Sequence, residues 1–594
     1  MSEPPATYEW EQLPWPKLER AVFKLQRRIY HASQRGEVRK VHRLQRLLLK
    51  SRAAHVLAVR RVTQDNQGKH TAGVDGVKSL PPPQRLHLAN HLGSVPAGKP
   101  LRRVWIAKRG TTEKRPLGIP TVQDRALQAL AKAALEPEWE AKFEPNSYGF
   151  RPGRSPHDAI GAIFTAINKQ PKYVLDADIA KCFDRIDHQA LLHKLATFPM
   201  LGRQIKRWLQ AGVLDHDVFT ATEAGTPQGG VVSPLLANIA LHGLEAHIRS
   251  HFPGQIRVDS GPEPTVANWK PQVIRYADDL VILHRDKSVI ETCHTLTKEW
   301  LQHMGLELNP KKTRIAHTLL DEGAAGFDFL GFSVRQYRVS KFNTGTGRGF
   351  KTLIKPSADA IKRHATELAE CISRNLAAKQ ENLIGLLNPK IAGWGNYYRA
   401  VISKEVFHKL DHQLYVKLAK WARYRHPRKS RHWVSRRYWD IEPGHGWVFG
   451  HRQGLALNAH ARIPIVRHAK VRGTASPYDG NWSYWASRRG TYPGIPRRLA
   501  SLLKKQQGRC QACELFFLPD ALVEIHHLDG NRHHNKYINL AAVHRHCHDQ
   551  IHGGHRTLSQ RIGTHDKSTI NRGAVCRETG THGSVDQREG QPSR

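Results

Sequence analysis

Residues 273–283 have the sequence Val-Ile-Arg-Tyr-Ala-Asp-Asp-Leu-Val-Ile-Leu. The two apolar runs predict buried strands, and the segment 276–279 between them predicts the tight turn of a hairpin. A second apolar run, residues 173–179, carries Asp176 and Asp178 near its end. Because strand side chains alternate between faces, such acids fit a core sheet only at its tip or opposite a cation. The pattern predicts a carboxylate metal site, although Asp278-Asp279 alone also fits an ordinary hairpin turn.

Carboxylates gathered from separate strands suit one particular reaction. Phosphodiester synthesis with two metal ions requires acids that hold two divalent cations about 3.5–4 Å apart. One cation activates the attacking 3′-oxygen and the other binds the triphosphate. The acids of the two apolar runs are therefore candidates for nucleotidyl transfer.

Eight short motifs occur in a fixed order along the chain. They are residues 73–76 (Gly-Val-Asp-Gly), 115–120 (Arg-Pro-Leu-Gly-Ile-Pro), 148–152 (Tyr-Gly-Phe-Arg-Pro), 176–184, 225–234, 276–279, 308–313 and 327–332. Any one of them is a weak signal. The ordered set resembles reverse transcriptases, and more closely the proteins encoded by mobile group II introns.

The resemblance implies roles for the acids. Asp178 and Asp278 would be the direct ligands of two Mg²⁺ ions, and Asp279 would complete the catalytic cluster. Asp176, two residues before Asp178 and on the same strand face, is the weaker candidate because the family pattern favours Asp178.

The resemblance also implies a nucleotide site. Phe183, five residues after Asp178, would clash with a 2′-hydroxyl and select deoxynucleotides, unless it is a plain core residue. Ile179 is a further candidate. Gln228 lies in a Pro-Gln-Gly-Gly turn whose glycines allow close approach of the backbone to template or nucleotide.

Three cations are expected around the triphosphate. Lys108 and Arg115 flank a hairpin tip at residues 110–112, and their donors would stabilise the charge on the leaving pyrophosphate. Lys312 would donate a proton to pyrophosphate or stabilise it. The alternative for Lys312 is an ordinary solvated charge.

The basic, helical stretch after residue 355 resembles the maturase (X) domain, which serves as the thumb in group II intron proteins. Residues 387–398 and 417–427 carry the resemblance. Arg and Lys can contact phosphates, and aromatic rings can stack on unpaired bases. Alternatively, Trp394, Tyr397, Tyr398 and Trp421 are helix-packing core. The implied activity is binding the parent intron RNA and promoting its splicing.

Four residues near the end of the chain have zinc-ligand spacing. Cys510 and Cys513 form one pair, and His544 and Cys547 form a second pair 30 residues later. Thiolate and imidazole ligands in two such pairs predict a structural tetrahedral Zn²⁺ site, with chance clustering as the alternative. His546 is a surplus candidate that we expect to be exposed.

A second histidine set lies within the same unit and resembles the HNH endonuclease ββα-metal motif. In that pattern His526, His548 and His552 hold one divalent cation, with Mg²⁺ expected, and His527 deprotonates the attacking water. A reference pKa near neutrality suits His527 to that role. Asn539 rather than Asn535 would fix the intervening loop. Nicking a target DNA would create the 3′-hydroxyl that primes reverse transcription.

The composition fits a polyanionic partner. Lys and Arg number 92 against 51 Asp and Glu, a formal net charge of +41, which nucleic acid neutralises with release of counterions. A solubility surface is the alternative. Seven cysteines in 594 residues argue against a disulfide framework. No secretory signal or membrane span is evident, so we expect a cytoplasmic bacterial protein, associated with the nucleoid when it acts on DNA.

The length requires several domains, because one hydrophobic core does not grow this large. We expect a multidomain α+β protein, a right-hand polymerase with fingers, palm and helical thumb followed by a C-terminal ββα-metal HNH unit. The expected palm is a small antiparallel sheet with helices behind it. The predicted regions are a basic helical extension (1–62), fingers and palm (63–355), thumb (356–442), a DNA-binding region (443–505), the HNH unit (506–556) and a polar tail (557–594).

The sequence thus predicts a group II intron protein that combines RNA-directed DNA polymerase, maturase and homing endonuclease, with intron RNA, target DNA and dNTPs as partners. One rival is a non-catalytic RNA-binding maturase with relic sites, which the intact acids and histidines oppose. Another is a stand-alone reverse transcriptase of a defence or retron system, which would lack residues 387–427 and 510–552. The oligomeric state stays open.

Overall fold

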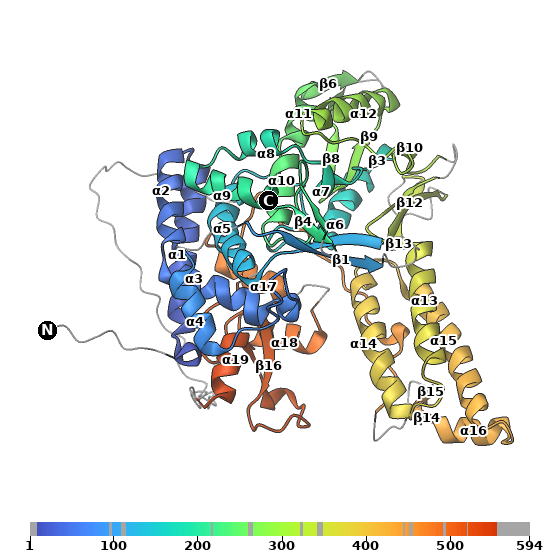
Figure 1. Ribbon diagram of the computed structural model, residues 1–594. Coiled ribbons are helices and arrows are strands. Elements are labelled where there is room, and N and C mark those ends of the chain that lie inside the picture. Colours follow the sequence, from blue (N-terminus) through green and yellow to red (C-terminus); the bar gives the residue numbers. More distant parts are fainter. Residues whose placement is uncertain are drawn as a thin grey trace, which may run out of the picture.

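The computed structural model describes residues 9–93, 98–107, 114–215, 218–258, 265–320, 325–340, 348–442, 446–450, 455–490, 495–518 and 521–554. Lys108, the hairpin tip 110–112 and the tail 557–594 lie outside the described residues. Figure 1 shows N-terminal helices on the left, a strand-rich centre and a helical arm on the right.

The described part of the extension predicted over residues 1–62 is helical. Its helices are α1 (Trp15–Gln34), α2 (Val38–Leu49) and α3 (Arg52–Arg60), preceded by the 3-10 helix η1 (Trp10–Gln12). The π-helix η2 (Arg61–Asp65), the 3-10 helix η3 (Gln67–His70) and α4 (Pro82–His91) follow. Apolar residues at helical spacing, such as Val22 and Ile29, are buried against α5 (Val122–Glu140). Because α5 is Ala-rich and buried on most of its surface, neighbouring helices pack close to it.

A first sheet lies beside these helices. Its strands are β1 (Leu101–Ala107), β2 (Lys114–Ile119), β4 (Val213–Asp215) and β5 (Val218–Thr220), in the order β2-β1-β4-β5. The β1–β2 hairpin is antiparallel, and β1 pairs with β4 in parallel.

The central sheet is the one predicted from the two acid-bearing runs. It comprises β3 (Tyr173–Asp178), β8 (Gln272–Tyr276), β9 (Asp279–His284) and β10 (Arg314–His317), in the order β10-β3-β9-β8 with every pair antiparallel. Its face with Leu175 and Ala177 packs on a helical core that includes α8 (His188–Leu195), α10 (Ser233–Leu241) and α12 (Lys287–Gln302). Val174 belongs to a different core, with α6 (Pro156–Ile167).

The sequence predicted helices behind this sheet, and both of its faces are covered. The reason lies in the strands themselves, since β9 has four apolar residues in a row at 280–283, and β3 and β8 each have an adjacent apolar pair, Val174-Leu175 and Val273-Ile274. A strand that is apolar on both faces needs cover on both. The acids remain accessible because they lie at the strand ends.

The helical arm follows a three-stranded sheet of β11 (Phe327–Phe329), β12 (Phe332–Arg338) and β13 (Phe350–Pro356). Its helices are α13 (Ala358–Ser373), α14 (Gln380–Tyr398), α15 (Lys404–Arg425) and α16 (Arg431–Tyr438). This confirms the helical stretch predicted after residue 355. No helix within the described ranges is long and apolar enough to span a membrane.

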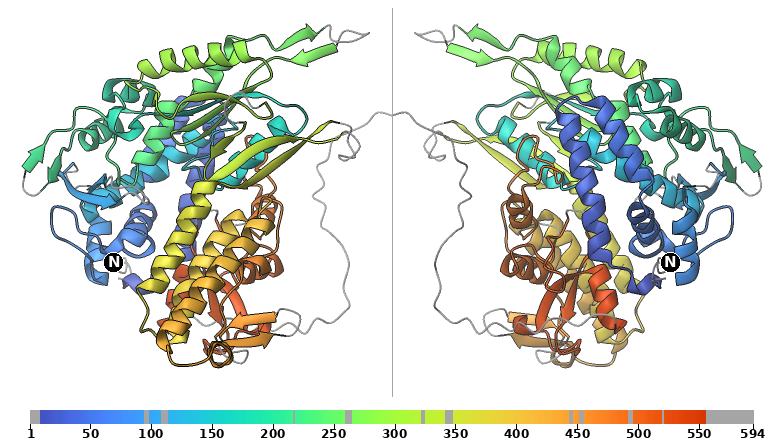
Figure 2. Two further views of the ribbon diagram at one scale, coloured as in Figure 1. Left: turned by 90° about the vertical axis from the view of Figure 1, so that its right-hand side faces the viewer. Right: turned by 90° about the vertical axis from the view of Figure 1, so that its left-hand side faces the viewer.

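The remaining elements connect these regions. They are α7 (Cys182–Arg185), α9 (Pro199–Leu209), α11 (Leu244–Ser250), β6 (Gln255–Val258), β7 (Thr265–Asn268), β14 (Trp439–Glu442), β15 (Gly446–Phe449), η5 (His460–Arg462), α17 (Trp482–Gly490) and α18 (Arg497–Lys505). Figure 2 shows the β6–β7 hairpin projecting from the top of the molecule, away from the C-terminal elements.

The last elements form a compact C-terminal unit, here called the Cys/His unit (residues 506–554). It contains β16 (Val523–His527), β17 (Leu540–His544) and α19 (Arg545–His552), with the short turn η6 (Tyr537–Asn539). The unit lies against the N-terminal helices (Figure 1). Arg60 Nη2 is 2.8 Å from Asp549 Oδ2, and His546 Nδ1 is 3.1 Å from Glu19 Oε1.

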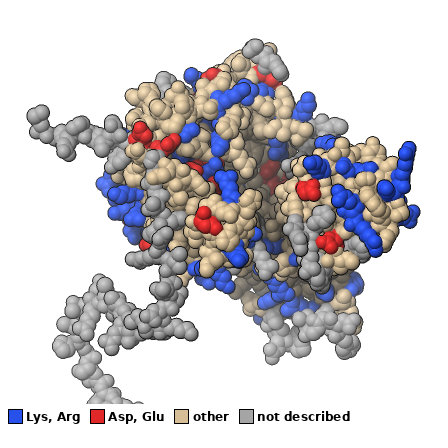
Figure 3. Space-filling view, turned by 90° about the horizontal axis from the view of Figure 1, so that it is seen from below, with Lys and Arg blue, Asp and Glu red and all other residues tan. Residues whose placement is uncertain are grey.

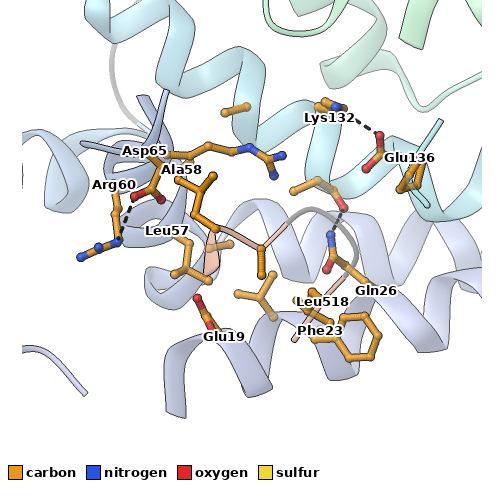
Figure 4. Close-up of a pocket in the computed structure, with 18 of the residues that line it drawn as sticks. Glu19, Phe23, Gln26, Leu57, Ala58, Arg60, Asp65, Lys132, Glu136 and Leu518 are labelled. Carbon is orange, nitrogen blue, oxygen red and sulfur yellow. Dashed lines mark hydrogen bonds and ion pairs between the residues drawn. The ribbon is translucent and has the colours of Figure 1, made fainter. Parts of the chain in front are cut away.

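A cavity of about 240 Å³ lies within this contact. Figure 4 shows Glu19 and Leu57 of the N-terminal helices lining it together with Leu518 of the Cys/His unit. An ion pair between Arg60 and Asp65, 3.6 Å apart, forms part of its wall. The chain's first and last described regions therefore share one interface.

Candidate active site and metal centres

The acids Asp178, Asp278 and Asp279 lie together at one end of the inner strands β3 and β9 of the central sheet. Asp178 ends β3 and pairs in register with Asp279, the first residue of β9. The backbone N–H of Ile179 donates to the carbonyl of Asp278 over 3.3 Å. Ala277, in the turn between β8 and β9, has a φ of 58°, the left-handed conformation that tight hairpins use. The structure thus brings together the acids that the sequence singled out.

Buried hydrogen bonds of the Arg275 side chain hold the β8–β9 hairpin in place. The Arg275 side chain is 4% exposed and donates to Asn238 Oδ1 at 3.0 Å, the Ala277 carbonyl at 3.2 Å and Ser147 Oγ at 2.7 Å. A Cβ on Gly149 would lie 2.3 Å from the Ala277 nitrogen. Only glycine fits there, which explains the glycine of the 148–152 motif. The sequence reasoning had assigned no role to Arg275.

The acids repel one another in a partly buried setting. Burial, followed by the charges of Asp278 and Asp178, raises the pKa of Asp279 to about 7. Burial also raises the pKa of Asp278. Lys312 offsets some of this charge, with Nζ 3.1 Å from Asp178 Oδ2. Such a cluster is stabilised by cations, so these residues fit divalent ions.

Asp176 is neutralised differently. Its Oδ2 lies 3.4 Å from Arg314 Nε, and burial raises its pKa to about 6. In the register of β3 it faces Val281, two pairs away from the Asp178–Asp279 pair. Both acids have a cation partner, but only Asp178 pairs with Asp279 next to the turn, in line with the preference for Asp178.

Two nucleotide-site candidates lie on α7 and in the loop between β5 and α10. Phe183 is half-buried against the helical core, and its ring lies edge-to-face with that of Phe150, 5.9 Å between centroids. The Phe183 ring therefore packs against the helical core and Phe150, and it is also partly accessible to solvent. Gln228 donates from Nε2 to Asp184 Oδ1 over 3.1 Å, so its amide is held near Phe183.

The other candidates differ in accessibility. Arg115 is exposed on β2, and its charge opposes the effect of burial on the pKa of Asp278. The Ile179 side chain is 1% exposed and belongs to the core, so only its backbone could meet a nucleotide. Lys108 lies outside the described residues.

Cys510, Cys513, His544 and Cys547 bring one ligand atom each within 4.8 Å of one another. Cys513 Sγ lies 3.4 Å from His544 Nδ1, and the His544 backbone N–H donates to Cys510 Sγ at 3.4 Å. Ligand atoms of a tetrahedral zinc site lie roughly 3.3–3.8 Å apart, given metal–ligand bonds of about 2.0–2.3 Å. The four residues fit Zn²⁺.

The surplus histidine, His546, was predicted to be exposed, but it is buried. It is 4% exposed, its ring stacks on that of His544 at 4.9 Å between centroids, and Nδ1 contacts Glu19 of α1. Its burial comes from docking on the N-terminal helices, which no local pattern announces. Its place is the interface between the two regions.

The histidines His526, His548 and His552 form the second cluster, again with ligand atoms within 4.8 Å. His548 and His552 lie one turn apart on α19, with their Nε2 atoms 3.2 Å apart. His526, on β16, is 6% exposed, and its buried Nδ1 has no hydrogen-bond partner. Three imidazoles with ligand atoms this close, one of which has a buried nitrogen without a partner, fit a divalent cation.

The histidine cluster has a neighbour that the sequence reasoning missed. Glu524 Oε2 lies 2.9 Å from His548 Nδ1. A carboxylate on Nδ1 holds the proton there and leaves Nε2 free for a metal. Glu524 is two residues before His526 on β16, hence on the same strand face. That period of two was the available signal.

His527 points to the opposite strand face and lies 3.4 Å, at Nε2, from Asn535 Oδ1. Asn539 is 6% exposed and ties the loop together. Its Oδ1 accepts from the Asp529 backbone at 3.0 Å, and its Nδ2 donates to Asp529 Oδ1 at 2.7 Å and to the His534 carbonyl at 2.8 Å. Asn539 is thus placed to fix the loop, while Asn535 contacts the proposed base.

In the arm, the aromatic residues chosen from the sequence pack rather than face solvent. Trp421 and Tyr398 are 1% and 5% exposed, and Trp394 and Tyr397 pack against the same core as Tyr398. Rings that remain open are Tyr415, Tyr424 and Trp433, at 50%, 68% and 38% exposure. These three rings lie among the Lys and Arg residues of α15 and α16. That interleaving of aromatic and basic residues in the sequence could have indicated them.

Comparison with known families covers much of the chain. Residues 106–334 match reverse transcriptase (RNA-dependent DNA polymerase), residues 10–92 match the N-terminal domain of reverse transcriptase, and residues 361–439 match the group II intron, maturase-specific domain. None of these three ranges reaches the Cys/His unit.

Three curated relatives agree with these matches. Protein YkfC of Escherichia coli (strain K12) is 33% identical over 330 residues, covering 49% of this chain and 82% of YkfC. The group II intron-encoded protein LtrA of Lactococcus lactis subsp. cremoris is 28% identical over 372 residues, covering 50% of this chain and 60% of LtrA.

An uncharacterized 91 kDa protein in the cob intron of Schizosaccharomyces pombe is 29% identical over 370 residues, covering 52% of this chain and 44% of that protein. The match thus spans less than two thirds of LtrA and of the cob-intron protein. With the acids placed together on the central sheet, these similarities show that the chain belongs to the family of group II intron-encoded reverse transcriptase/maturase proteins.

Proposed function

We propose that this protein copies its parent intron RNA into DNA, promotes splicing of that RNA, and nicks a target DNA whose free 3′-end primes the copying. The observation that carries the polymerase proposal is the register of Asp178 with Asp279 beside the Asp278 turn. Its partners would be the intron RNA, target DNA and dNTPs. We expect it in the bacterial cytoplasm, and at the nucleoid when it acts on DNA.

The proposed architecture is a right hand. The central sheet would be the palm and the β1–β2 hairpin part of the fingers, together covering residues 63–355. The arm, residues 356–442, would be the thumb. Residues 443–505 would contact DNA, and residues 506–556 would be the HNH unit.

In the polymerase site, Asp178 and Asp278 would bind two Mg²⁺ ions, which supply Lewis-acid activation of the 3′-oxygen and charge neutralisation at the triphosphate. Lys312, released from Asp178, would reach the pyrophosphate as donor. Arg115 would bind a phosphate from β2. Phe183 would lie under the sugar, where its partly accessible ring supports discrimination against a 2′-hydroxyl.

The arm supports the RNA-binding proposal through charge. Exposed cations on α15 and in the segment after it include Lys417, Lys420, Arg423, Arg428 and Lys429. Figure 3 shows Lys and Arg side chains on both sides of the hollow between the arm and the rest of the molecule, with few acidic ones. Cations of this density bind phosphates, and the open rings of the arm can stack on unpaired bases.

In the nuclease site, His526, His548 and His552 would hold one Mg²⁺ that stabilises charge on the scissile phosphate. His527 would take a proton from water, oriented by Asn535. The Zn²⁺ held by Cys510, Cys513, His544 and Cys547 would be structural, since all four ligand positions are filled by the protein.

The polymerase proposal is tested by Asp278→Ala in primer extension on an RNA template. We expect extension to fall by about a thousandfold, the loss of several kcal/mol of metal-assisted stabilisation, while RNA affinity stays within twofold. Asp359→Ala, an exposed acid at the start of α13, is the matched control. Residual extension within tenfold of wild type would refute the assignment.

The wider proposal is tested by purifying the protein with its bound RNA and sequencing that RNA. The particle is then assayed for target-primed extension with His527 intact and as His527→Ala. We expect intron RNA in the particle, and target-primed extension to fall about a hundredfold or more in the variant, with extension from a pre-nicked target unchanged. A particle without intron RNA would favour a stand-alone reverse transcriptase instead.

A further inference from the structure

An exposed apolar pair, Tyr537 and Ile538, stands at the tip of the loop between β16 and β17. Ile538 is 78% exposed, the highest value among the large hydrophobic side chains described, and Tyr537 is 50% exposed. Leu528, at the other end of the loop, is 44% exposed. Exposed apolar side chains that lie together with polar residues around them are candidates for a contact surface. We call residues 537–538 the apolar tip.

The apolar tip is held in place rather than frayed. It belongs to η6, and the next residue, Asn539, is buried and makes the three hydrogen bonds to Asp529 and His534 described above. The Leu528 backbone N–H also donates to the Asn539 carbonyl at 2.9 Å. A firmly anchored turn presents Ile538 outward at little further cost in conformational entropy when it binds.

The tip is close to the proposed nuclease base. His527 pairs in register with Leu540, and Ile538 precedes Leu540 by two residues, in the turn η6 that leads into β17. Asn535, in the same loop, contacts His527 and also accepts from Arg498 Nη1 at 2.8 Å. The loop thus links the tip, the base and a cation of α18.

Charge around the tip selects one kind of partner. Arg532, His533 and Lys536 are exposed beside it. The loop's acid, Asp529, is paired with His534, 2.6 Å between Oδ2 and Nδ1. Apolar side chains framed by cations suit duplex DNA, in which the cations bind phosphates and the apolar residues enter between base pairs.

We infer that the apolar tip is a wedge that enters the groove of the target duplex and unstacks one base step beside the phosphodiester presented to His527. Ile538 would insert between the bases, and Tyr537 would cover the exposed base face. This inference rests on the proposed nuclease function. It also assigns a preference, because pyrimidine–purine steps such as TA and CA open most readily.

The test uses the full-length protein with bound RNA and a duplex of the two exon sequences that flank its intron, with 2-aminopurine placed at successive steps around the nick. Wild type should raise the fluorescence at one step near the nick. Ile538→Ser should abolish that rise and slow nicking of the intact duplex about tenfold or more. Ile441→Ser, another exposed isoleucine at 59%, should do neither.

A duplex with a mismatch at the same step separates the wedge from other causes. We expect Ile538→Ser to nick this opened duplex within threefold of wild type. Equal loss on both duplexes, or no loss on either, would overturn the wedge. Unstacking is also measured with His527→Ala, which should retain it. If the protein binds the duplex and unstacks it without ever nicking, the nuclease proposal fails and the wedge stands.

Discussion

The acidic site of the central sheet and the Cys/His unit both gather metal-ligating side chains, but they do so in opposite ways. Within the described residues, the sets of three or more such side chains that bring ligand atoms within 4.8 Å of one another are both in the Cys/His unit. At the acidic site, Lys312 and Arg314 each hold one carboxylate. Carboxylates repel, whereas neutral imidazoles and hydrogen-bonded thiols can approach.

The hydrophobic cores that support the acidic site and the Cys/His unit also differ, in size. The acidic site stands on strands whose side chains, such as Leu175, Leu280 and Ile282, are fully buried in a large core. The Cys/His unit has a small core, which it shares with Leu502 and Leu503 of α18 and which includes Cys510 and Cys547 themselves. A large core folds without metal, whereas a unit this small gains folding energy from it. Metal at the acidic site would act in catalysis, and metal in the Cys/His unit would stabilise its fold.

The largest expected effect separates the two directly. Cys547→Ser should unfold the Cys/His unit, raise its amide hydrogen exchange throughout residues 506–554, and abolish nicking by more than a hundredfold. Primer extension at saturating Mg²⁺ should stay within twofold. Cys371→Ser is the control, because Cys371 is only partly buried and far from the unit in the fold. A variant unit that keeps its exchange protection would show that zinc is dispensable for its fold.

Sequence reasoning reached the acidic site because its signals are local. Apolar runs, paired acids and a turn fix a hairpin, and the alternation of a strand fixes which acids share a face. It missed Arg275, because one cation within an apolar run carries no indication of its buried partners Ser147 and Asn238. That cation could have been questioned, since a charge at the centre of a buried strand must be satisfied by something.

The docking of the Cys/His unit on the N-terminal helices was beyond prediction for a different reason. Arg60 and Asp549 stand 489 positions apart, and each alone looks like a surface charge. The burial of His546 follows from that docking and not from its own helix. Local pattern predicts elements and their faces, whereas contacts between distant elements depend on shapes that no short motif contains.

The second prediction concerns Lys312. Lys312→Met removes the cation beside Asp178, and we expect the maximal rate of extension to fall about a hundredfold, the size of a lost general acid. Arg314→Met removes the corresponding partner of Asp176, and its rate should fall less than fivefold. The two rates are measured in single-turnover primer extension. Equal losses would mean that both cations only balance charge.

The third prediction moves to the histidine cluster. Glu524→Gln weakens the hold on His548 Nδ1, and affinity for a divalent cation should fall about tenfold. Titration of Mn²⁺ into the full-length protein, followed by calorimetry, measures this. Glu514→Gln, at an exposed acid of the same unit, should leave the affinity unchanged. An unchanged affinity in Glu524→Gln would make the Glu524–His548 contact a surface ion pair without effect on the site.

The smallest effect is one of stability, and it tests whether the acidic site is strained without its cations. Because the pKa of Asp279 is raised to about 7, the native state binds the proton more tightly than the unfolded chain does. Its contribution is complete below about pH 4 and is lost as the pH rises to about 7. Asp279→Asn is neutral at every pH. It should therefore match wild type at pH 4 and, without added Mg²⁺, melt about 2–4 °C higher at pH 8, the shift expected for about 1 kcal/mol.

Calorimetry at the two pH values checks this, with the exposed acid variant Asp328→Asn as control. Added Mg²⁺ should stabilise wild type more than Asp279→Asn, because the cation relieves the repulsion that the substitution has already removed. A variant less stable than wild type at pH 8 would show that the carboxylate is held by contacts stronger than that repulsion, and the contrast with the preassembled Cys/His unit would fall.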